Sequence, residues 1–136
     1  WARETYKIKN LGLMITDSHT IPLRRGTLGI TLAHHGFTPL KDYRGERDIF
    51  GREFLIQVAD IADGLAAAAV VAMGEGKETT PLAVITDVPF VEFTDKPYRP
   101  DKPFSSFEIE EKEDLYYPLL SSVPWQKGRG GTHQQG

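Results

Sequence analysis

Residues 60–74, which read DIADGLAAAAVVAMG, decide the fold of this chain. Alanine, valine and leucine dominate this stretch and predict a helix over 61–73, because alanine has the highest helix propensity. Asp60 is a suitable N-cap, and Asp63 three residues later is placed as in a capping box. Gly74 is well placed to end the helix. Since the helix has so little charge, we expect it to be buried on most of its sides.

Four short runs around this helix predict β-strands, because they are apolar or alternate between polar and apolar residues: 11–16, 27–32, 54–58 and 81–85. Asp17 follows the first run, so we expect a buried strand that delivers polar groups at its C-terminal end. Gly29 either weakens the second strand or marks the close approach of another backbone. Together these elements predict an α+β fold in which a mixed sheet packs with a buried alanine-rich helix.

The composition excludes several classes of protein. The 136 residues, 40% of them hydrophobic, are enough for one domain. The absence of cysteine excludes a disulfide scaffold, a cysteine-ligated zinc site and a thiol nucleophile. A net charge of −3 does not favour nucleic acid as a partner. The longest apolar run, 64–73, is shorter than the roughly 20 residues of a membrane span, and no signal peptide is recognisable, so we expect a cytoplasmic protein with no membrane contact.

Three zones differ in composition. Residues 1–88 contain the predicted helix and strands and are expected to form the folded domain. Residues 89–103 contain four prolines, which predict an irregular connection because proline fixes φ and donates no hydrogen bond. Residues 104–136 combine an acidic extension with a glycine-rich end that we expect to be disordered. Because the chain starts at Trp1 and not at methionine, we expect a fragment, a processed product or a shortened protein.

Two segments of the first zone carry side chains that could bind ions. Asp17 precedes Ser18, and a carboxylate beside a hydroxyl could bind a hard cation such as Mg²⁺ or Mn²⁺. The alternative is a turn, which aspartate and serine commonly form. Arg24 and Arg25 precede Gly26 and could hold a phosphate or a carboxylate with paired hydrogen bonds. The alternative there is a solvated pair of charges before a strand.

Two further segments combine glycine with charge. Residues 42–52 interleave charges, glycines and aromatic residues, and could form a surface loop with internal salt bridges or a loop that holds substrate. Residues 73–80, MGEGKETT, link the predicted helix to the last predicted strand. Glycine would let a phosphate approach this backbone and Lys77 could neutralise it. The spacing matches neither the Walker A nor the dinucleotide-binding motif, so a plain turn is the alternative.

The order of these segments resembles the γ-glutamyl ligase family of coenzyme F-420 biosynthesis. The family pattern runs Asp-Thr, Arg-Arg-Gly, Asp-x-Arg-Gly-x-x-Asp-x-x-Gly-Arg, Val-Ala-Asp-Glu-Leu-Ala and Met-Gly-Gln. The corresponding segments here are Asp17-Ser18, Arg24-Arg25-Gly26, 42–52, 61–66 and Met73-Gly74-Glu75. The resemblance covers residues 11–85. It implies that the chain is part of a larger ligase fold and lacks the N-terminal half of that fold.

The resemblance also implies chemistry. The family joins L-glutamate to a deazaflavin, coenzyme F-420-0, with GTP and Mn²⁺ or Mg²⁺, and its members are homodimers. The resemblance implies that this chain acts on a related acidic acceptor and that the missing N-terminal half contributes to the site. By the same resemblance, three residues contact the metal ions: Asp17, Ser18 and Glu75. The segment that holds GTP corresponds to Met73, Gly74, Glu75, Gly76, Lys77, Glu78, Thr79 and Thr80.

The resemblance assigns no role to the arginines. Because phosphate and an acidic substrate are both anions, we expect Arg24 and Arg25 to act in catalysis. For the same reason we expect Arg44 and Arg52 to bind the substrate.

Three departures from the family pattern are informative. Ser18 replaces a threonine and keeps its hydroxyl. Glu75 replaces a glutamine, and the added negative charge should tighten the binding of a divalent metal. Gly64 replaces a glutamate, at a cost of roughly 1 kcal/mol relative to alanine in a helix. We therefore expect a divergent branch whose acceptor can differ from the deazaflavin. The alternatives to a ligase are a non-catalytic nucleotide- or metal-binding module and a dimerisation fragment.

Overall fold

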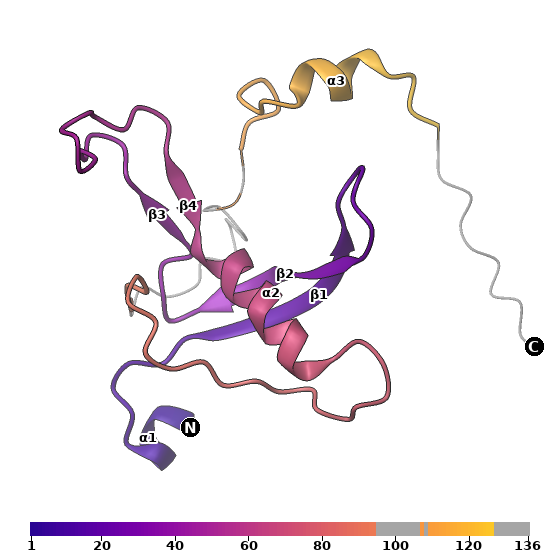
Figure 1. The fold of residues 1–136 in the computed structure, drawn as a ribbon. Helices are drawn as coiled ribbons and strands as arrows, with labels where there is room; N and C mark the ends of the chain where they lie inside the picture. The colour runs from indigo at the N-terminus through magenta and orange to yellow at the C-terminus, as the bar shows by residue number, and fades with distance from the viewer. Residues whose placement is uncertain (95–106, 108, 127–136) are drawn as a thin grey trace, which may run out of the picture.

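The structure, a computed structural model, describes residues 1–94, 107 and 109–126. Its elements, in chain order, are α1 (Ala2–Tyr6), β1 (Leu13–Thr20), β2 (Thr27–His35), β3 (Leu40–Asp42), β4 (Val58–Asp60), α2 (Ile61–Met73) and α3 (Tyr117–Ser122). The strands form two antiparallel pairs, β1 with β2 and β3 with β4 (Figure 1). The predicted α+β class is therefore confirmed.

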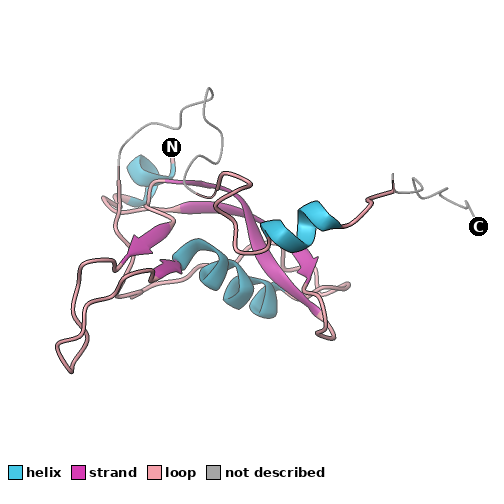
Figure 2. Ribbon diagram, turned by 90° about the horizontal axis from the view of Figure 1, so that it is seen from above, coloured by secondary structure: helices cyan, strands magenta, loops and turns pink. Residues whose placement is uncertain are grey.

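The helix α2 lies against one face of the β1–β2 hairpin, as both views of the ribbon show (Figures 1 and 2). Gly29 of β2 allows this contact. A Cβ atom at Gly29 would lie 2.5 Å from the Ala66 carbonyl oxygen and 2.5 Å from Cγ2 of Val70. Both distances are far below van der Waals contact, so only glycine fits here. The predicted alternative for Gly29, a close backbone approach, is confirmed.

The ends of α2 are those that the sequence predicts. The Asp60 side chain accepts a hydrogen bond of 2.9 Å from the Asp63 N–H, and Gly74 follows the last helical residue. The Asp63 carboxylate does not complete a capping box. It accepts a 2.8 Å hydrogen bond from the Thr31 N–H instead, so it ties the first turn of the helix to β2.

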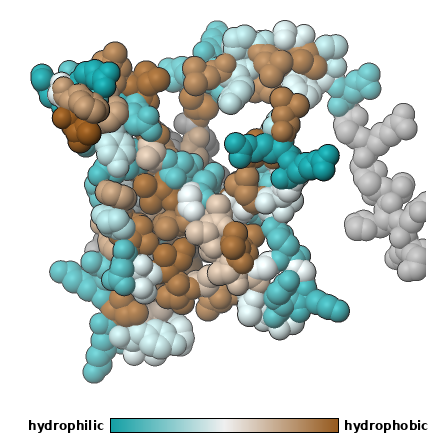
Figure 3. Space-filling view, viewed as in Figure 1, coloured by the Kyte–Doolittle hydropathy of each residue, from teal (hydrophilic) through white to brown (hydrophobic). Residues whose placement is uncertain are grey.

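Only one side of α2 is buried. Its buried residues are Ala62, Ala66, Ala69 and Val70. Val71 on the opposite side is 86% exposed, and Figure 3 shows apolar surface gathered over the centre of this face of the molecule. The expectation of a helix buried on most sides is therefore wrong for the described part of the chain, because the hairpin covers one face alone. In that part, no helix has the length and hydropathy that crossing a membrane requires.

The first predicted strand differs from β1 in position and burial. β1 continues to Thr20, since residues 17–20 pair with residues 27–30 of β2 in the hairpin. Asp17 therefore lies inside the strand and not after its end. The strand is also not buried, because Leu13 and Ile15 on the face away from α2 are 62% and 59% exposed. The second predicted strand is confirmed and extends to His35.

The other two strand predictions are largely wrong. Of residues 54–58, only Val58 is in a strand, and the rest belong to a long loop between β3 and β4. We call this loop, residues 43–57, the arm; in Figure 1 it projects from the β3–β4 pair, away from α2. Residues 81–85 form no strand, because among the described residues they join neither the β1–β2 sheet nor the β3–β4 sheet. Apolar composition alone does not supply the neighbouring strand that hydrogen bonding requires.

The two later zones are described only in part. Of the predicted connection 89–103, the structure describes residues 89–94, in which Phe93 forms a single bridge with Phe37. In 104–136 it describes residue 107 and residues 109–126, where the sequence predicts no helix but α3 forms. The predicted disordered end, beyond residue 126, lies outside the described residues.

Candidate functional site

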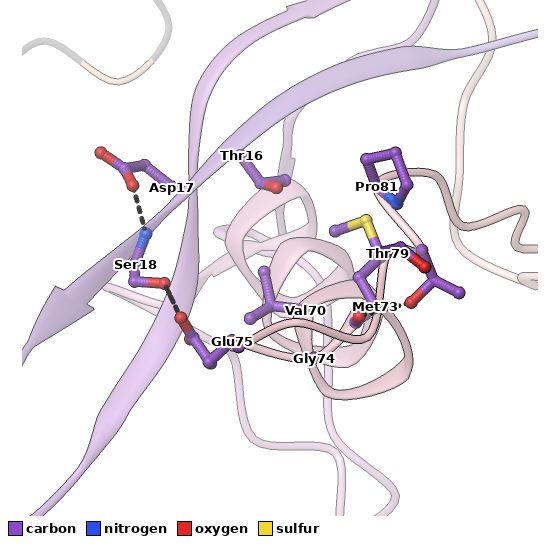
Figure 4. Close-up of a pocket in the computed structure, with 11 residues that line it drawn as sticks. Thr16, Asp17, Ser18, Val70, Met73, Gly74, Glu75, Thr79 and Pro81 are labelled. Atoms are coloured by element: carbon purple, nitrogen blue, oxygen red, sulfur yellow. Dashed lines mark hydrogen bonds between the residues drawn. The ribbon is translucent and has the colours of Figure 1, made fainter.

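An open cleft of about 520 Å³ lies at the C-terminal end of α2 (Figure 4). β1 forms one wall with Thr16, Asp17 and Ser18, and the end of α2 and the loop after it form the other. The lining residues on that second side are Val70, Met73, Gly74, Glu75, Gly76, Thr79, Thr80 and Pro81. The cleft thus joins the first and fourth candidate segments, which the sequence separates by more than fifty residues.

Glu75 connects the two walls. Ser18 Oγ lies 2.7 Å from Oε1 and 2.6 Å from Oε2 of Glu75 and donates its hydrogen to this carboxylate. Thr27, at the start of β2, donates from Oγ1 to Oε1 over 3.2 Å. The loop after α2 is therefore fastened to both strands of the hairpin through one carboxylate.

The loop that follows α2 is also closed on itself. Thr80 Oγ1 donates a 2.6 Å hydrogen bond to the Met73 carbonyl, which brings the two ends of the segment together. The Gly76 N–H donates to Glu78 Oε2 over 2.8 Å. Gly74 has φ 82°, and a Cβ there would lie 2.6 Å from Cδ of Glu78, so glycine is required at this bend.

The structure brings together most of the predicted metal and nucleotide residues. Asp17, Ser18 and Glu75 line the cleft, as do six of the eight residues of 73–80. The other two, Lys77 and Glu78, do not line it. Most of the predicted metal and nucleotide residues therefore lie in one cleft, and their roles stay predictions.

The donor set fits a hard divalent cation in part. Carboxylate and hydroxyl oxygens are the ligands that Mg²⁺ and Mn²⁺ prefer. However, the Asp17 carboxylate accepts from the Ser18 N–H over 2.8 Å and points away from Glu75 (Figure 4). The described residues contain no group of three or more histidines, aspartates or glutamates placed to hold a metal ion. A cation here would therefore need further ligands, from a nucleotide, from water or from more polypeptide.

The predicted catalytic arginines lie outside the cleft. Arg24 and Arg25 are exposed in the turn between β1 and β2, and neither lines the cleft. The turn has two residues with positive φ, Leu23 at 60° and Gly26 at 99°. Of the two interpretations of this segment, the structure shows an exposed pair of charges before a strand.

The arginines predicted to bind substrate lie on the arm and are paired there. Arg44 forms a two-pronged salt bridge with Asp42, whose shortest distance is 2.6 Å from Nη2 to Oδ2. The hydrogen bonds from Arg44 lower the pKa of the Asp42 carboxyl to about 2. Arg52 lies 3.3 Å from Asp48. Two internal salt bridges thus pair four of the six charged side chains of 42–52, and a role of this segment in substrate binding stays a prediction.

Thr27 contacts Glu75 at the site, although reasoning from the sequence assigned it no role. A signal for it exists, because Ser18 pairs with Gly29, and Thr27 precedes Gly29 by two residues. Side chains two apart on a strand share a face, so Thr27 and Ser18 both face the side on which α2 lies. Once the hairpin register is known, this alternation identifies Thr27 as a neighbour of Ser18.

Comparisons with known proteins match the same region of the chain. Residues 3–87 match the family model described as F420-0:Gamma-glutamyl ligase. This chain belongs to that family. The γ-glutamyl ligase match includes the cleft, the hairpin, α2 and the arm, and it ends before α3.

Curated members of the γ-glutamyl ligase family resemble the chain over the same region. The Coenzyme F420:L-glutamate ligase of Methanococcus maripaludis is 44% identical over 87 residues, which are 64% of this chain and 35% of that protein. The ligase of the same name from Methanocaldococcus jannaschii is 43% identical over 84 residues, 60% of this chain and 34% of its own length. The one from Methanothermobacter thermautotrophicus is 35% identical over 82 residues, 60% and 32% of the two chains. The chain thus spans about a third of the length of these relatives.

Proposed function

We propose that the intact protein joins L-glutamate through a γ-linkage to coenzyme F-420-0 or a related carboxylate acceptor, with GTP as the source of energy. Family membership and the names of the relatives, Coenzyme F420:L-glutamate ligase, support the substrates. The observation that carries the proposal for this chain is the contact of Ser18 with Glu75. It joins the hydroxyl, the carboxylates and the glycine-containing loop in one cleft.

The proposed reaction begins at a carboxylate, whose anion is a poor electrophile. Transfer of the terminal phosphoryl group of GTP to an acceptor carboxylate oxygen gives an acyl phosphate and GDP. The amine of L-glutamate then attacks the acyl carbon, the carbon–oxygen bond to phosphate breaks, and the amine loses a proton as the amide forms. Catalysis of such a transfer depends mainly on the positioning of the reactants and the neutralisation of phosphate charge.

The residues of the cleft suit that task. Asp17, Ser18 and Glu75 would hold Mn²⁺ or Mg²⁺, and the bound ion would neutralise the negative charge of the phosphates. The loop 73–80 has glycine at positions 74 and 76, where backbone N–H groups can approach a phosphate. The Glu78 carboxylate lies beside both glycines and accepts from the Gly76 N–H, so it would have to move before a phosphate binds there. Because this chain supplies few metal ligands, the phosphates of the nucleotide are expected to complete the coordination.

Glu75 gives the proposed site one more negative charge than the glutamine of the family pattern. A carboxylate attracts a divalent cation more strongly than an amide does. It also repels phosphate when no cation is present. We therefore propose that nucleotide binding depends on the metal more strictly in this protein than a glutamine at position 75 would require.

A calorimetric titration tests the proposal. The intact protein is titrated with MnCl₂ alone, and then with GTP in the presence and absence of MnCl₂. We expect Mn²⁺ binding and GTP binding that requires Mn²⁺. Asp17→Asn should weaken Mn²⁺ binding at least tenfold, because a carboxylate ligand is lost. The matched control is Asp87→Asn, an exposed aspartate outside the cleft, which should bind as the wild type does.

Activity gives the second measurement. Incubation with GTP, L-glutamate and coenzyme F-420-0 should release GDP and phosphate and yield the glutamylated product, detected by its mass. Other carboxylate acceptors are tested in the same way. Metal-dependent activity that persists in Asp17→Asn would contradict the assignment of Asp17.

A second candidate function is favoured by one feature of the hairpin. The face of β1 away from α2 exposes Leu13 and Ile15, and apolar side chains of this size are normally covered. This chain would then act as a non-catalytic half-site or as a dimerisation element, completed by the N-terminal part of the fold or by a second copy. In that case the chain by itself would bind neither Mn²⁺ nor GTP, and co-expression with the N-terminal part would restore both.

A further inference from the structure

We infer that Thr27 is a positioning residue that holds the Glu75 carboxylate in the orientation needed for divalent-cation binding. The inference rests on the proposed function, because it concerns the same cleft. It assigns a role to a residue outside the predicted metal set.

The first argument is the way in which Glu75 is held. Glu75 lies after the end of α2 in an exposed loop, where a glutamate would ordinarily sample many rotamers. In the part of the chain that the structure describes, two side chains hydrogen-bond its carboxylate, those of Ser18 and Thr27. Each comes from a different strand of the hairpin. The carboxylate is therefore held by donors on both strands of the hairpin.

The second argument separates the two hydroxyl groups. Ser18 lines the cleft, so its oxygen is placed to contact a cation directly. Thr27 does not line the cleft, yet its Oγ1 reaches Glu75 Oε1 over 3.2 Å. Its hydroxyl can act on a bound cation only through Glu75. An ionised carboxylate has about four lone-pair directions, so two hydroxyl donors leave acceptor capacity for a cation.

The third argument concerns the distance between the helix and the hairpin. The close approach at Gly29 brings the end of α2, and with it Glu75, to the strands that carry Ser18 and Thr27. Thr27 lies two residues before Gly29 and faces the same side of the hairpin. The packing that forms the core thus also sets the geometry of this contact.

The test compares three variants of the intact protein in Mn²⁺ binding, measured by calorimetry with MnCl₂ alone. Thr27→Val keeps the shape of the side chain and removes the hydroxyl. Thr27→Ser keeps the hydroxyl. Thr20→Val is the matched control, because Thr20 pairs directly with Thr27 across the hairpin and makes no described contact with Glu75.

We expect Thr27→Val to weaken Mn²⁺ binding by about threefold to tenfold, which is the range of an ordinary hydrogen bond, because water at this exposed site screens the charge of Glu75. Thr27→Ser and Thr20→Val should bind within twofold of the wild type. The unfolding temperatures of Thr27→Val and Thr20→Val should agree. In a Glu75→Ala background, Thr27→Val should have no further effect on Mn²⁺ binding, since the two residues act as one unit.

Two results would overturn the inference and leave the proposed function intact: equal Mn²⁺ binding by Thr27→Val and the wild type, or the same loss in both backgrounds. Tighter binding in Thr27→Val would also overturn it, because the hydroxyl would then compete with the cation. No Mn²⁺ binding by the wild type would instead overturn the proposed metal site together with this inference.

Discussion

The two antiparallel strand pairs in the described part of the chain, the β1–β2 hairpin and the β3–β4 pair with its arm, are stabilised in different ways. The β1–β2 hairpin has α2 packed against one face, and its position depends on residues far away in sequence, such as Ala66 opposite Gly29. The arm between β3 and β4 projects beyond this packed unit, with Ile49 92% and Phe50 73% exposed at its end (Figure 1). Its backbone hydrogen bonds stay within the arm itself, as from the Tyr43 N–H to the Gln57 carbonyl and from the Gly45 N–H to the Phe54 carbonyl. The comparison shows that the cleft depends on tertiary packing, whereas the arm is organised locally.

Two aspartates add short-range side-chain contacts to the arm. Asp48 Oδ1 accepts 2.8 Å hydrogen bonds from the backbone N–H groups of Phe50 and Arg52, which closes the turn at the end of the arm. Asp42 binds Arg44 at its base. Because these contacts span four residues or fewer, they can form without α2 or the hairpin.

The largest expected effect comes from the contact between α2 and β2. Gly29→Ala should lower the free energy of unfolding by about 2–3 kcal/mol, because the new Cβ would overlap the Ala66 carbonyl oxygen and force the helix away. It should also weaken Mn²⁺ binding, since Glu75 moves with the helix. Chemical denaturation and calorimetry measure the two effects.

Gly64→Ala is the matched control for that substitution. A Cβ at Gly64 meets nothing within 4 Å, and the residue is helical, so alanine should stabilise the protein by about 0.5–1 kcal/mol. A loss of stability from Gly29→Ala together with a gain from Gly64→Ala would establish that the close contact between α2 and β2 requires glycine at position 29. A gain in stability from both would contradict the close approach.

The next largest effect on stability is expected from the hydrogen bond between Asp63 and the backbone of Thr31. Asp63→Ala removes the acceptor of the Thr31 N–H and should cost about 1–2 kcal/mol of unfolding free energy. The helix keeps its Asp60 cap, since that bond uses the backbone N–H of residue 63. Faster amide exchange at Thr31, with unchanged exchange in the arm, is the expected signature. Equal acceleration in both regions would mean that the arm depends on α2 after all.

Asp48→Ala should affect the arm and leave the packing of α2 on the hairpin unchanged. The loss of its hydrogen bonds should speed the amide exchange of Phe50 and Arg52 about tenfold or more and change global stability by less than about 0.5 kcal/mol. Asp87→Asn, at an exposed aspartate outside the arm, serves as the control, because asparagine tolerates the positive φ of 59° at this position. A global loss above about 1 kcal/mol would contradict the local character of the arm.

The smallest effect concerns the Asp42–Arg44 pair. The pKa of Asp42 lies at about 2, below its ordinary 3.8, because Arg44 hydrogen-bonds the ionised form. A lowered pKa in the folded state means that the pair stabilises the protein above about pH 4 and that this contribution is lost as the pH falls toward about 2. Since both groups are exposed, the effect on stability should be small.

Arg44→Gln tests this pair directly. The pKa of Asp42, followed by the NMR shift of its carboxyl carbon, should rise toward 3.8, whereas Arg52→Gln should leave it unchanged. An equal rise in both variants would assign the shift to the general charge of the arm and not to the salt bridge.

Several elements could be predicted from the sequence because their causes are local. The bounds of α2 depend on a cap three residues from its partner and on the glycine that ends it. The loop 73–80 was recognisable from its glycines and from its place after the helix. Runs 54–58 and 81–85 mislead, because an apolar run becomes a strand only where a neighbouring strand supplies hydrogen bonds.

By itself, the sequence determined the helix, the order of the candidate segments and the resemblance to the γ-glutamyl ligases, since these depend on residue types and their spacing. Only the tertiary structure decided that Ser18 and Thr27 hold Glu75 and that the four arginines lie outside the cleft. The hairpin register and the close packing at Gly29 place these groups. Both arise from contacts between residues far apart in the chain, which local spacing does not encode.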